Sequence, residues 1–303
     1  NLFLYYFLLF SKKILSETIA GGTSQPNLLL GDLRSFLIPL PPLEYQIQIS
    51  KNLSTLDSKI QNLQNQNHTL EQTAQAIFKS WFVDFDGVTE FEDSELGQIP
   101  KGWSIKSIKE IVSKKKYSIV DGPFGTQLHN DEYVSEGIPV VKVKNLSFNG
   151  TFLDNSFSYI TEEKFNYLIR SAVYPGDILL AKTGNTIGKF SMLPSYINRA
   201  LIASSNLKIS PNPEKFNKFY IYNIIQNLTK IDYWNNISAG STRPTITLSD
   251  VRNIDIIYPN DQIMKKYFLL VEPLYNLKEK NIISLYSLTK TRDALLPKLM
   301  SGE

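Results

Sequence analysis

An apolar stripe between residues 49 and 77 returns at alternating intervals of four and three residues. This spacing keeps one face of a helix turned towards a partner helix, which is the pattern of a coiled coil. The alternative is an ordinary amphipathic helix lying on a globular core. The regular spacing favours the coiled coil, in which about 32 residues would extend roughly 48 Å. The stripe consists of Ile49, Leu53, Leu56, Ile60, Leu63, Asn67, Leu70, Ala74 and Ile77.

A second, less regular stripe follows Gln262, where the chain again has the pattern of a long helix. Because proline lacks an amide N–H and clashes with the preceding turn, we expect Pro273 to kink or restart this helix. The natural partner of one stripe is the other, packed antiparallel, with the intervening domain at one end of the pair. The apolar positions are Tyr267, Leu270, Leu274, Leu277, Leu285, Leu288 and Leu295.

Two copies of one segment precede the two stripes, "AGGTSQPNLLLGDLR" from Ala20 and "SAGSTRPTITLSDVR" from Ser238, at a constant offset of 218 residues. Each copy follows an aromatic, helix-like stretch, and its apolar residues after the proline have the pattern of a strand. With only two copies, the repeat indicates a duplicated domain rather than a solenoid. The identical pairs are Gly22 and Gly240, Pro26 and Pro244, Leu30 and Leu248, Asp32 and Asp250, Arg34 and Arg252, Ile38 and Ile256, and Pro41 and Pro259.

The composition excludes several classes of site. The chain has no cysteine, which removes disulfides and thiolate metal sites and favours a reducing, cytoplasmic setting. With two histidines, His68 and His129, a histidine-rich metal site is nearly excluded. The opening run "NLFLYYFLLF" is too short to span a bilayer, and no basic residue precedes it as in a signal peptide. We therefore expect neither a bound metal nor a membrane partner.

The region between the stripes alternates short apolar runs with polar turns, which predicts an α+β domain. "IPVVKVKNL" and "ALIASSNLKIS" each have the pattern of a strand, and "GDILLAKTGNTIGKFSML" that of two strands joined by a turn. The whole chain is thus expected to be α+β, with one globular α/β domain and long antiparallel coiled-coil helices. An acidic run from Asp84 to Glu95 precedes this domain.

Polar side chains at the turns of this domain could read DNA. Arg and Lys can form two hydrogen bonds to guanine, Asn and Gln can do so to adenine, and Ser and Thr suit phosphates. The competing explanation is that turns are polar in most proteins, and for Arg243 that it forms a packing salt bridge. The candidate DNA contacts are Gln127, Lys142, Lys144, Asn145, Thr183, Asn185, Ser241, Thr242 and Arg243.

No catalytic site is evident in the sequence. "GPFG" and "GNTIG" lack the Gly-Lys-Ser/Thr ending of a phosphate-binding loop. Asp121, Asp131 and Asp177 could imitate a nuclease cluster, but loop carboxylates are more often solvated or capping groups. A cryptic nuclease or methyltransferase therefore remains the third hypothesis, behind a DNA reader and a coiled-coil protein that binds a protein or peptide.

The motifs together resemble the specificity subunit (HsdS) of type I restriction–modification systems, over nearly the whole chain. "QAIFKSWFVDFDGV" (75–88) and "LGQIPKGW" (96–103) are similar to the junction between the central helix and the second target-recognition domain. "DGPFGTQL", "YVSEGIPVVKVKNL" and "GDILLAKTGNTIGK" resemble recognition-domain signatures, and "TRDALLPKLMSGE" resembles the family's C-terminal ending.

The resemblance implies a division of the chain. Residues 1–42 would be the C-terminal remnant of a first recognition domain, so the chain resembles a half or N-terminally truncated subunit. Such a remnant would expose Phe3, Tyr6, Phe7 and Phe10 unless it docks on another part of the protein. The further divisions are a spacer helix at 43–83, an acidic linker at 84–98, a target-recognition domain at 99–261 and a second spacer helix at 262–303.

The resemblance also implies the partners. The recognition domain would read one half of a split double-stranded DNA target, and the helices would bind methyltransferase (modification) subunits. The restriction subunit would join through the complex, and two copies could pair through their helices. This chain would bind no cofactor, since S-adenosylmethionine, ATP and Mg²⁺ serve the partner subunits. Phe78, Trp81 and Phe82 are the candidate partner-binding residues, and packing within the chain is the alternative for them.

Overall fold

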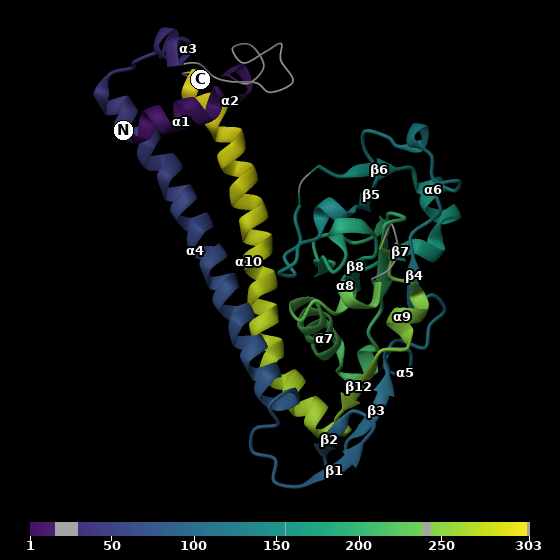
Figure 1. The fold of residues 1–303 in the computed structure, drawn as a ribbon. Helices are drawn as coiled ribbons and strands as arrows, with labels where there is room; N and C mark the ends of the chain where they lie inside the picture. The colour runs from purple at the N-terminus through teal and green to yellow at the C-terminus, as the bar shows by residue number, and fades with distance from the viewer. Residues whose placement is uncertain (16–29, 155, 239–243, 302–303) are drawn as a thin grey trace. The chain divides into compact units, whose positions relative to one another are not determined.

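The computed structural model describes residues 1–15, 30–154, 156–238 and 244–301 (Figure 1). It divides into two compact units, one of residues 1–69 with 280–303 and one of residues 70–279. The division passes through both long helices, α4 (Leu43–Phe82) and α10 (Asp261–Ser301). Unit 1 and unit 2 are therefore described separately.

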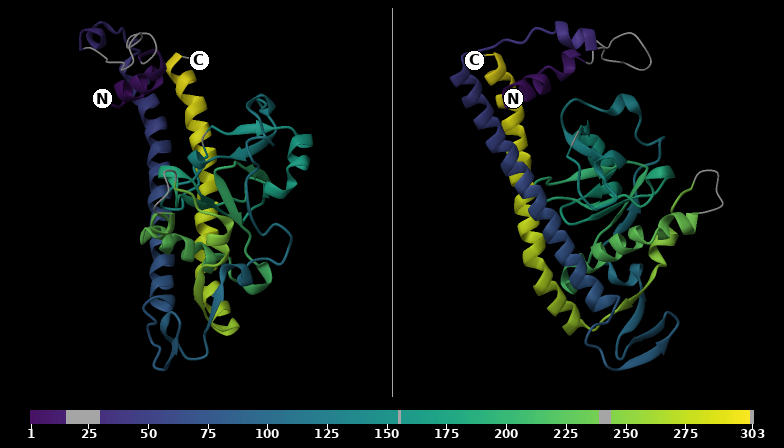
Figure 2. Two further views of the ribbon diagram at one scale, coloured as in Figure 1. Left: turned by 45° about the vertical axis from the view of Figure 1, so that its right-hand side comes forward. Right: turned by 60° about the vertical axis from the view of Figure 1, so that its left-hand side comes forward.

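Unit 1 contains the first part of α4, the last part of α10, and the short helices α1 (Leu2–Phe10), α2 (Lys12–Ile14) and α3 (Leu30–Ser35). In Figures 1 and 2, α1 lies across α4 and α10 near the N- and C-terminal ends of the chain. Phe3, Tyr6 and Phe7 are buried there against Leu53 and Met300, and Phe10 is partly buried beside them. Phe3, Tyr6, Phe7 and Phe10 therefore dock on the helix pair, whereas Tyr5 of the same helix is exposed.

The long helices of unit 1 run antiparallel. Arg292 of α10 contacts Asp57 of α4 at 3.2 Å (Nη1 to Oδ1), and Asn281 Nδ2 donates to Gln66 Oε1 at 3.4 Å. Residue numbers rise along α4 as they fall along α10, as two opposed seams require.

Unit 2 holds the strands and the remaining helices. The helices are α5 (Ile108–Ile111), α6 (Glu162–Tyr167), α7 (Lys218–Lys230), α8 (Tyr233–Ser238) and α9 (Leu248–Arg252). The strands are β1 (Phe91–Ser94), β2 (Gly97–Pro100), β3 (Ser104–Ser107), β4 (Ile119–Asp121), β5 (Ile138–Val141), β6 (Ser158–Ile160), β7 (Ala172–Val173), β8 (Ile178–Ala181), β9 (Phe190–Met192), β10 (Ala200–Ile202), β11 (Asn206–Ile209) and β12 (Asp255–Tyr258).

Two four-stranded sheets form the centre of unit 2, with the strand orders β6–β5–β10–β7 and β4–β11–β8–β9. β10 pairs parallel with β5, whereas β11 pairs antiparallel with both β4 and β8. The turn between β10 and β11 carries the chain from one sheet to the other. "ALIASSNLKIS", expected as one strand, is therefore two strands in different sheets. The chain is α+β, as predicted.

Two further two-stranded sheets, β1–β2 and β3–β12, flank these. The acidic run from Asp84 to Glu95 thus leads into a β-hairpin formed by β1 and β2. β12 lies C-terminal to the place where the repeat predicted a strand, because residues 248–252 form α9 instead. Thr247 Oγ1 accepts the Asp250 N–H, and Asp250 Oδ2 accepts the Thr247 N–H, which caps this helix.

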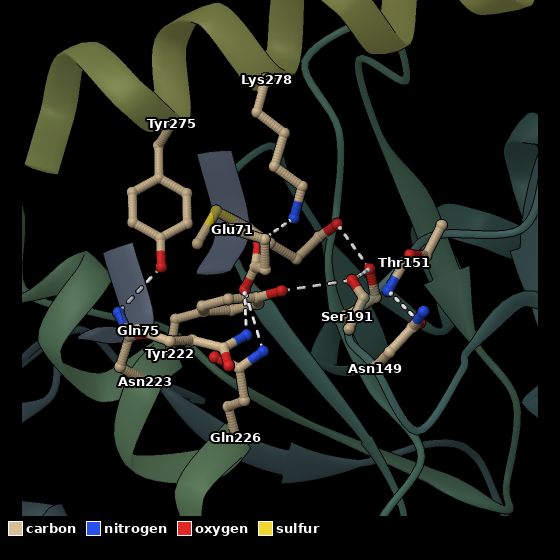
Figure 3. A network of polar contacts seen from close by, with 12 residues as sticks. Glu71, Gln75, Asn149, Thr151, Ser191, Tyr222, Asn223, Gln226, Tyr275 and Lys278 are labelled. Carbon is tan, nitrogen blue, oxygen red and sulfur yellow. Dashed lines mark hydrogen bonds and ion pairs between the residues drawn. The ribbon is translucent and has the colours of Figure 1, made fainter. Parts of the chain in front are cut away.

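A buried polar network connects α7 with α4 and α10 inside unit 2 (Figure 3). The Glu71 carboxylate on α4 is paired with the Lys278 ammonium on α10 and accepts a 2.9 Å hydrogen bond from Gln226 Nε2 on α7. Burial, and then the nearby Glu71 charge, raise the pKa of Tyr222 and Tyr275 far above the ordinary value, so both phenols stay protonated. The network fixes α7 on the two long helices.

The seam residues of the long helices differ in part from the predicted ones. On α4 all nine predicted positions are buried or half-buried. On α10, Leu270 and Leu277 are exposed, and Lys278, Asn281 and Arg292 face the seam instead, because each has a polar partner there. α10 is one helix through Pro273, so of the kink or restart expected there the restart does not occur.

The helices of the structure follow the same repeat as the sequence. The offset that relates Gly22 to Gly240 also relates the first residues of α4 and α10, Leu43 and Asp261, and the first residues of α3 and α9, Leu30 and Leu248. The same sequence offset aligns α1 with the middle of α7.

Candidate nucleic-acid interface

The ends of several strands meet at one edge of unit 2. Ala203 N–H donates to Val141 O at 3.0 Å, Gly122 N–H to Asn206 O at 3.0 Å, and Lys182 N–H to Ser205 O at 2.9 Å. Since β4 and β8 are both antiparallel to β11, their C-terminal ends lie beside its first residue. We call this surface the strand-end edge; it comprises residues 121–127, 142–145, 182–186 and 203–206, together with Arg170, which contacts Asp121.

Two residues fix the backbone at the centre of the strand-end edge. Asn206 is fully buried, and its Nδ2 donates to Val141 O at 3.0 Å, which joins the two sheets. Gly122 lies so close to the Ala203 carbonyl that a Cβ at this position would collide with it. The side chains at this edge therefore project from a rigid base.

One cationic group on this edge surrounds Asp121. Lys182 Nζ lies 2.7 Å from Asp121 Oδ2, and Arg170 Nη2 lies 3.3 Å from Asp121 Oδ1. Two positive charges thus share one carboxylate, and Arg170 is the more exposed of the two. The group keeps a net positive charge beside the 122–127 loop.

A second cationic group follows β5, which ends at Val141, so that Lys142 and Lys144 come after the strand. Lys142 Nζ lies 4.3 Å from the centroid of the Tyr133 ring and 2.8 Å from Ser158 Oγ. Burial, and then the neighbouring Lys144, lower the pKa of Lys142. Lys144 is exposed, with its Nζ 3.1 Å from Ser156 Oγ. An approaching phosphate would relieve the repulsion between these two ammonium groups.

Asn145, which sequence reasoning placed among the DNA contacts, is fully buried. Its Oδ1 accepts the Lys142 N–H at 2.9 Å, and its Nδ2 donates to Leu153 O at 3.0 Å. The amide therefore holds the turn that presents Lys142 and Lys144, and it is not available to a base. Gln127 is exposed, but its Oε1 accepts the Phe124 N–H at 3.0 Å.

The β8–β9 tip carries Thr183 and Asn185, of which Asn185 is exposed and Thr183 half-buried. Gly184 N–H donates to Pro244 O at 3.0 Å, and Ile246 N–H donates to Lys182 O at 2.8 Å. The tip is therefore attached to the chain at Pro244. Ser241, Thr242 and Arg243 lie outside the described residues, directly before that attachment.

Comparison with known proteins decides the family. A family model described as "Type I restriction modification DNA specificity domain" matches residues 1–72 and 100–285. The MjaIX specificity subunit of Methanocaldococcus jannaschii is 32% identical, over 99% of this chain and 68% of that protein. The chain belongs to the type I restriction–modification specificity subunits. It is a DNA-specificity subunit of such a system and is itself non-catalytic.

More distant relatives agree with the family. The HindI specificity subunit of Haemophilus influenzae is 24% identical over 96% of this chain and 73% of its own length. The crystal structure of an S subunit from M. genitalium superposes with a TM-score of 0.59 at 20% identity, covering 98% of this chain and 72% of that one. That structure has the same fold.

The candidate partner-binding residues of this specificity subunit belong largely to its own core. Phe78 and Phe82 are buried, and their ring centroids lie 5.8 and 4.9 Å from that of Tyr220. Trp81 is half-buried, 6.1 Å from the Tyr267 ring. Packing within the chain therefore accounts for Phe78 and Phe82, and only Trp81 keeps part of its surface for a partner.

Sequence reasoning missed three residues of the strand-end edge. Arg170 and Lys182 were not singled out, although both are cations next to predicted turns. Phe124 lies inside "DGPFGTQL", which resembles a recognition-domain signature, but the sequence reading did not single out its ring. Among the described residues, no group of acidic or histidine side chains could hold a metal ion, and no helix is long and apolar enough to cross a membrane.

Proposed function

We propose that the strand-end edge is the surface with which this specificity subunit reads one half of a bipartite double-stranded DNA target. The observation that carries the proposal is the convergence of Lys142, Lys144, Arg170 and Lys182 on one rigid edge. Cations on a rigid base suit the phosphate contacts that position a protein on a duplex. The alternative is a coiled-coil interaction module without DNA specificity.

The proposed roles follow from exposure. Lys144 and Arg170 would contact phosphate or guanine, and Asn185 would read an adenine edge. Asn145 and Gln127 would position their neighbours rather than contact bases. Ser241, Thr242 and Arg243 stay predicted contacts, supported by the attachment of Pro244 to Gly184.

We propose that the methyltransferase subunits dock on the long helices, and that the restriction subunit joins through the complex. Leu269, Leu270 and Leu277 support this within unit 2, since all three are apolar and exposed on α10. S-adenosylmethionine, ATP and Mg²⁺ would serve those partner subunits. Such a complex, acting on cellular DNA, would be cytoplasmic.

We also propose that residues 1–42 are the closing segment of another recognition domain. The repeat supports this, because Leu2, Leu4 and Leu40 are exposed in unit 1 whereas their counterparts in unit 2, Tyr220, Tyr222 and Tyr258, are buried in the main hydrophobic core. A second copy of the chain could supply the cover by pairing with two-fold symmetry. Light scattering at micromolar concentration, with and without the methyltransferase subunits, tests this pairing, and a strict monomer in both would contradict it.

The test of DNA reading begins with the reconstituted methyltransferase complex. Sequencing of methylated adenines in DNA treated with it gives the target, and anisotropy then compares a duplex carrying that target with a scrambled one. We expect preference for the target and a steep loss of affinity with salt. Lys144→Ala should weaken binding to both duplexes, whereas Asn185→Ala should reduce the preference. Equal, salt-insensitive binding to both duplexes would favour the interaction module.

A further inference from the structure

Phe124 is an exposed aromatic residue at the tip of a tight turn on the strand-end edge. Its side chain is 62% exposed, and the two residues before it, Gly122 and Pro123, are buried. Among the described residues, the structure gives its ring no aromatic or cationic neighbour. By contrast, Phe148 lies under Lys189 and Tyr167 under Lys164, at 5.5 and 5.1 Å from ring centroid to Nζ.

The turn holds Phe124 outward. Phe124 N–H donates to Gln127 Oε1 at 3.0 Å, and Gln127 N–H donates back to Phe124 O at 2.8 Å. The base of the loop is fixed because Gly122 is pressed against the Ala203 carbonyl and donates to Asn206 O. An apolar ring kept in water is unfavourable, and here a rigid turn prevents it from folding back.

The charges around the Phe124 ring indicate which kind of molecule it would contact. Asp121, three residues before Phe124, is bound by Lys182 and Arg170, and the second cationic group, with Lys142, begins directly after β5 on the same edge. A cationic surface with one apolar projection suits a nucleic-acid duplex, whose phosphates meet the cations while the ring reaches the bases. Apolar side chains inserted between base steps unstack and kink duplexes in this way.

We propose that Phe124 inserts into the bound duplex as an apolar wedge and that Gln127 positions it. This inference rests on the proposed function, since it requires the strand-end edge to face DNA. The wedge would add to sequence specificity in a way that hydrogen bonds to base edges do not, because the free energy needed to open a base step depends on the sequence of that step. Phe124 would thereby make the subunit sensitive to the deformability of its target.

The experiment uses the complete methyltransferase complex and a duplex carrying its mapped target, with 2-aminopurine placed in turn at each step of the half-site. Apart from the methylated adenine, which the methyltransferase itself takes out of the stack, wild type should raise the fluorescence at one step, since unstacking relieves quenching. Phe124→Ala should abolish that rise and weaken binding roughly tenfold, in the range of base–aromatic stacking. Tyr167→Ala removes a similarly exposed ring outside the strand-end edge and should leave both readouts unchanged.

The role of Gln127 is tested by Gln127→Met, which keeps the length of the side chain and removes the acceptor. We expect a smaller fluorescence rise and an unchanged methylated sequence, with thermal unfolding as in wild type. A changed target sequence would show that Gln127 reads a base instead. Target binding by Phe124→Ala with the wild-type affinity and fluorescence rise would overturn the wedge alone, whereas absence of DNA binding by wild type would overturn the proposed function as well.

Discussion

In each of the two units, a carboxylate on α4 binds a cation on α10 and accepts a hydrogen bond from a shorter helix, but the two groups are buried to different depths. In unit 1, Asp57 of α4 is paired with Arg292 of α10 and accepts a 2.8 Å hydrogen bond from Tyr6 of α1. In unit 2, Glu71 of α4 is paired with Lys278 of α10 and accepts one from Gln226 of α7. α1 and α7 are the helices related by the repeat.

The difference between the two groups is exposure to water. The Asp57 and Arg292 side chains are 30% and 26% exposed, whereas those of Glu71 and Lys278 are 9% and 14% exposed. When a partly exposed charge loses its ion-pair partner, water can solvate it. A buried charge that loses its partner is left without solvation. The comparison therefore indicates that unit 2 depends much more than unit 1 on every member of its group.

The largest effect is expected from Lys278→Met, which leaves the Glu71 carboxylate buried without its cation. Removing one partner of a buried pair costs about 3–5 kcal/mol. Urea unfolding of wild type and variant measures the cost, with Lys280→Met as the control on an exposed lysine of the same helix. A loss no larger than that of the control would mean that the buried pair contributes nothing.

The next largest difference between the units is expected in how their stability falls at alkaline pH. In unit 2, burial is the main cause that raises the pKa of Tyr222, Tyr267 and Tyr275; in unit 1, burial and Asp57 raise the pKa of Tyr6. Above a pH of about 10 the unfolded chain releases these protons and the folded chain keeps them, so stability falls by about 1.4 kcal/mol per pH unit for each such tyrosine.

Tyr275→Phe removes one such proton, so the decline of stability with rising pH should be shallower by that amount. Unfolding measured across alkaline pH tests this, and Tyr286→Phe, an exposed tyrosine on the same helix, is the control. Identical slopes for wild type and Tyr275→Phe would contradict the expectation.

Tyr6→Phe should have a smaller effect in unit 1. It removes the hydrogen bond to Asp57 and keeps the ring in its apolar site, so we expect a loss of about 1–2 kcal/mol. Comparison with Tyr5→Phe in thermal unfolding checks the value, because Tyr5 is exposed. Equal midpoints for the two variants would show that the bond contributes nothing.

The smallest effect is expected from Arg292→Met. Its ion pair with Asp57 is open to water, and such pairs contribute about 0–1 kcal/mol. The same urea titration as for Lys278→Met allows the two losses in free energy of unfolding to be compared directly. A loss in Arg292→Met as large as in Lys278→Met would remove the distinction between the units.

The sequence predicted the fold class and the α4 stripe because spacing and turn residues are local signals. It failed on α10, where Leu270 and Leu277 were assigned to the seam and Lys278 and Arg292 were not. Apolar periodicity cannot detect a polar side chain that is buried because it has a partner on another helix. The sequence reading also missed the capping pair of Thr247 and Asp250, because it followed the apolar alternation of this segment, which indicated a strand, and not the local Thr-x-x-Asp spacing that begins a helix.

The candidate site was predictable as a region but not residue by residue. "VVKVKN" contains two cations after a strand, and these lie on the strand-end edge. Asn145 is equally polar in sequence, yet a turn directs it inward, and Gln127 uses its acceptor on its own loop. The direction of a side chain in a turn depends on contacts with the backbone, such as that of Asn145 with Leu153 O and that of Gln127 with the Phe124 N–H, which the sequence does not show.

The seam has a further consequence for how copies of this chain can combine. The acidic residues Asp57 and Glu71 both lie on α4, and the basic residues Lys278 and Arg292 both lie on α10. If two α4 helices packed together, carboxylates would face carboxylates, and if two α10 helices packed together, cations would face cations. These charges disfavour the pairing of a long helix with its own kind and favour an assembly of two copies in which each α4 lies beside an α10.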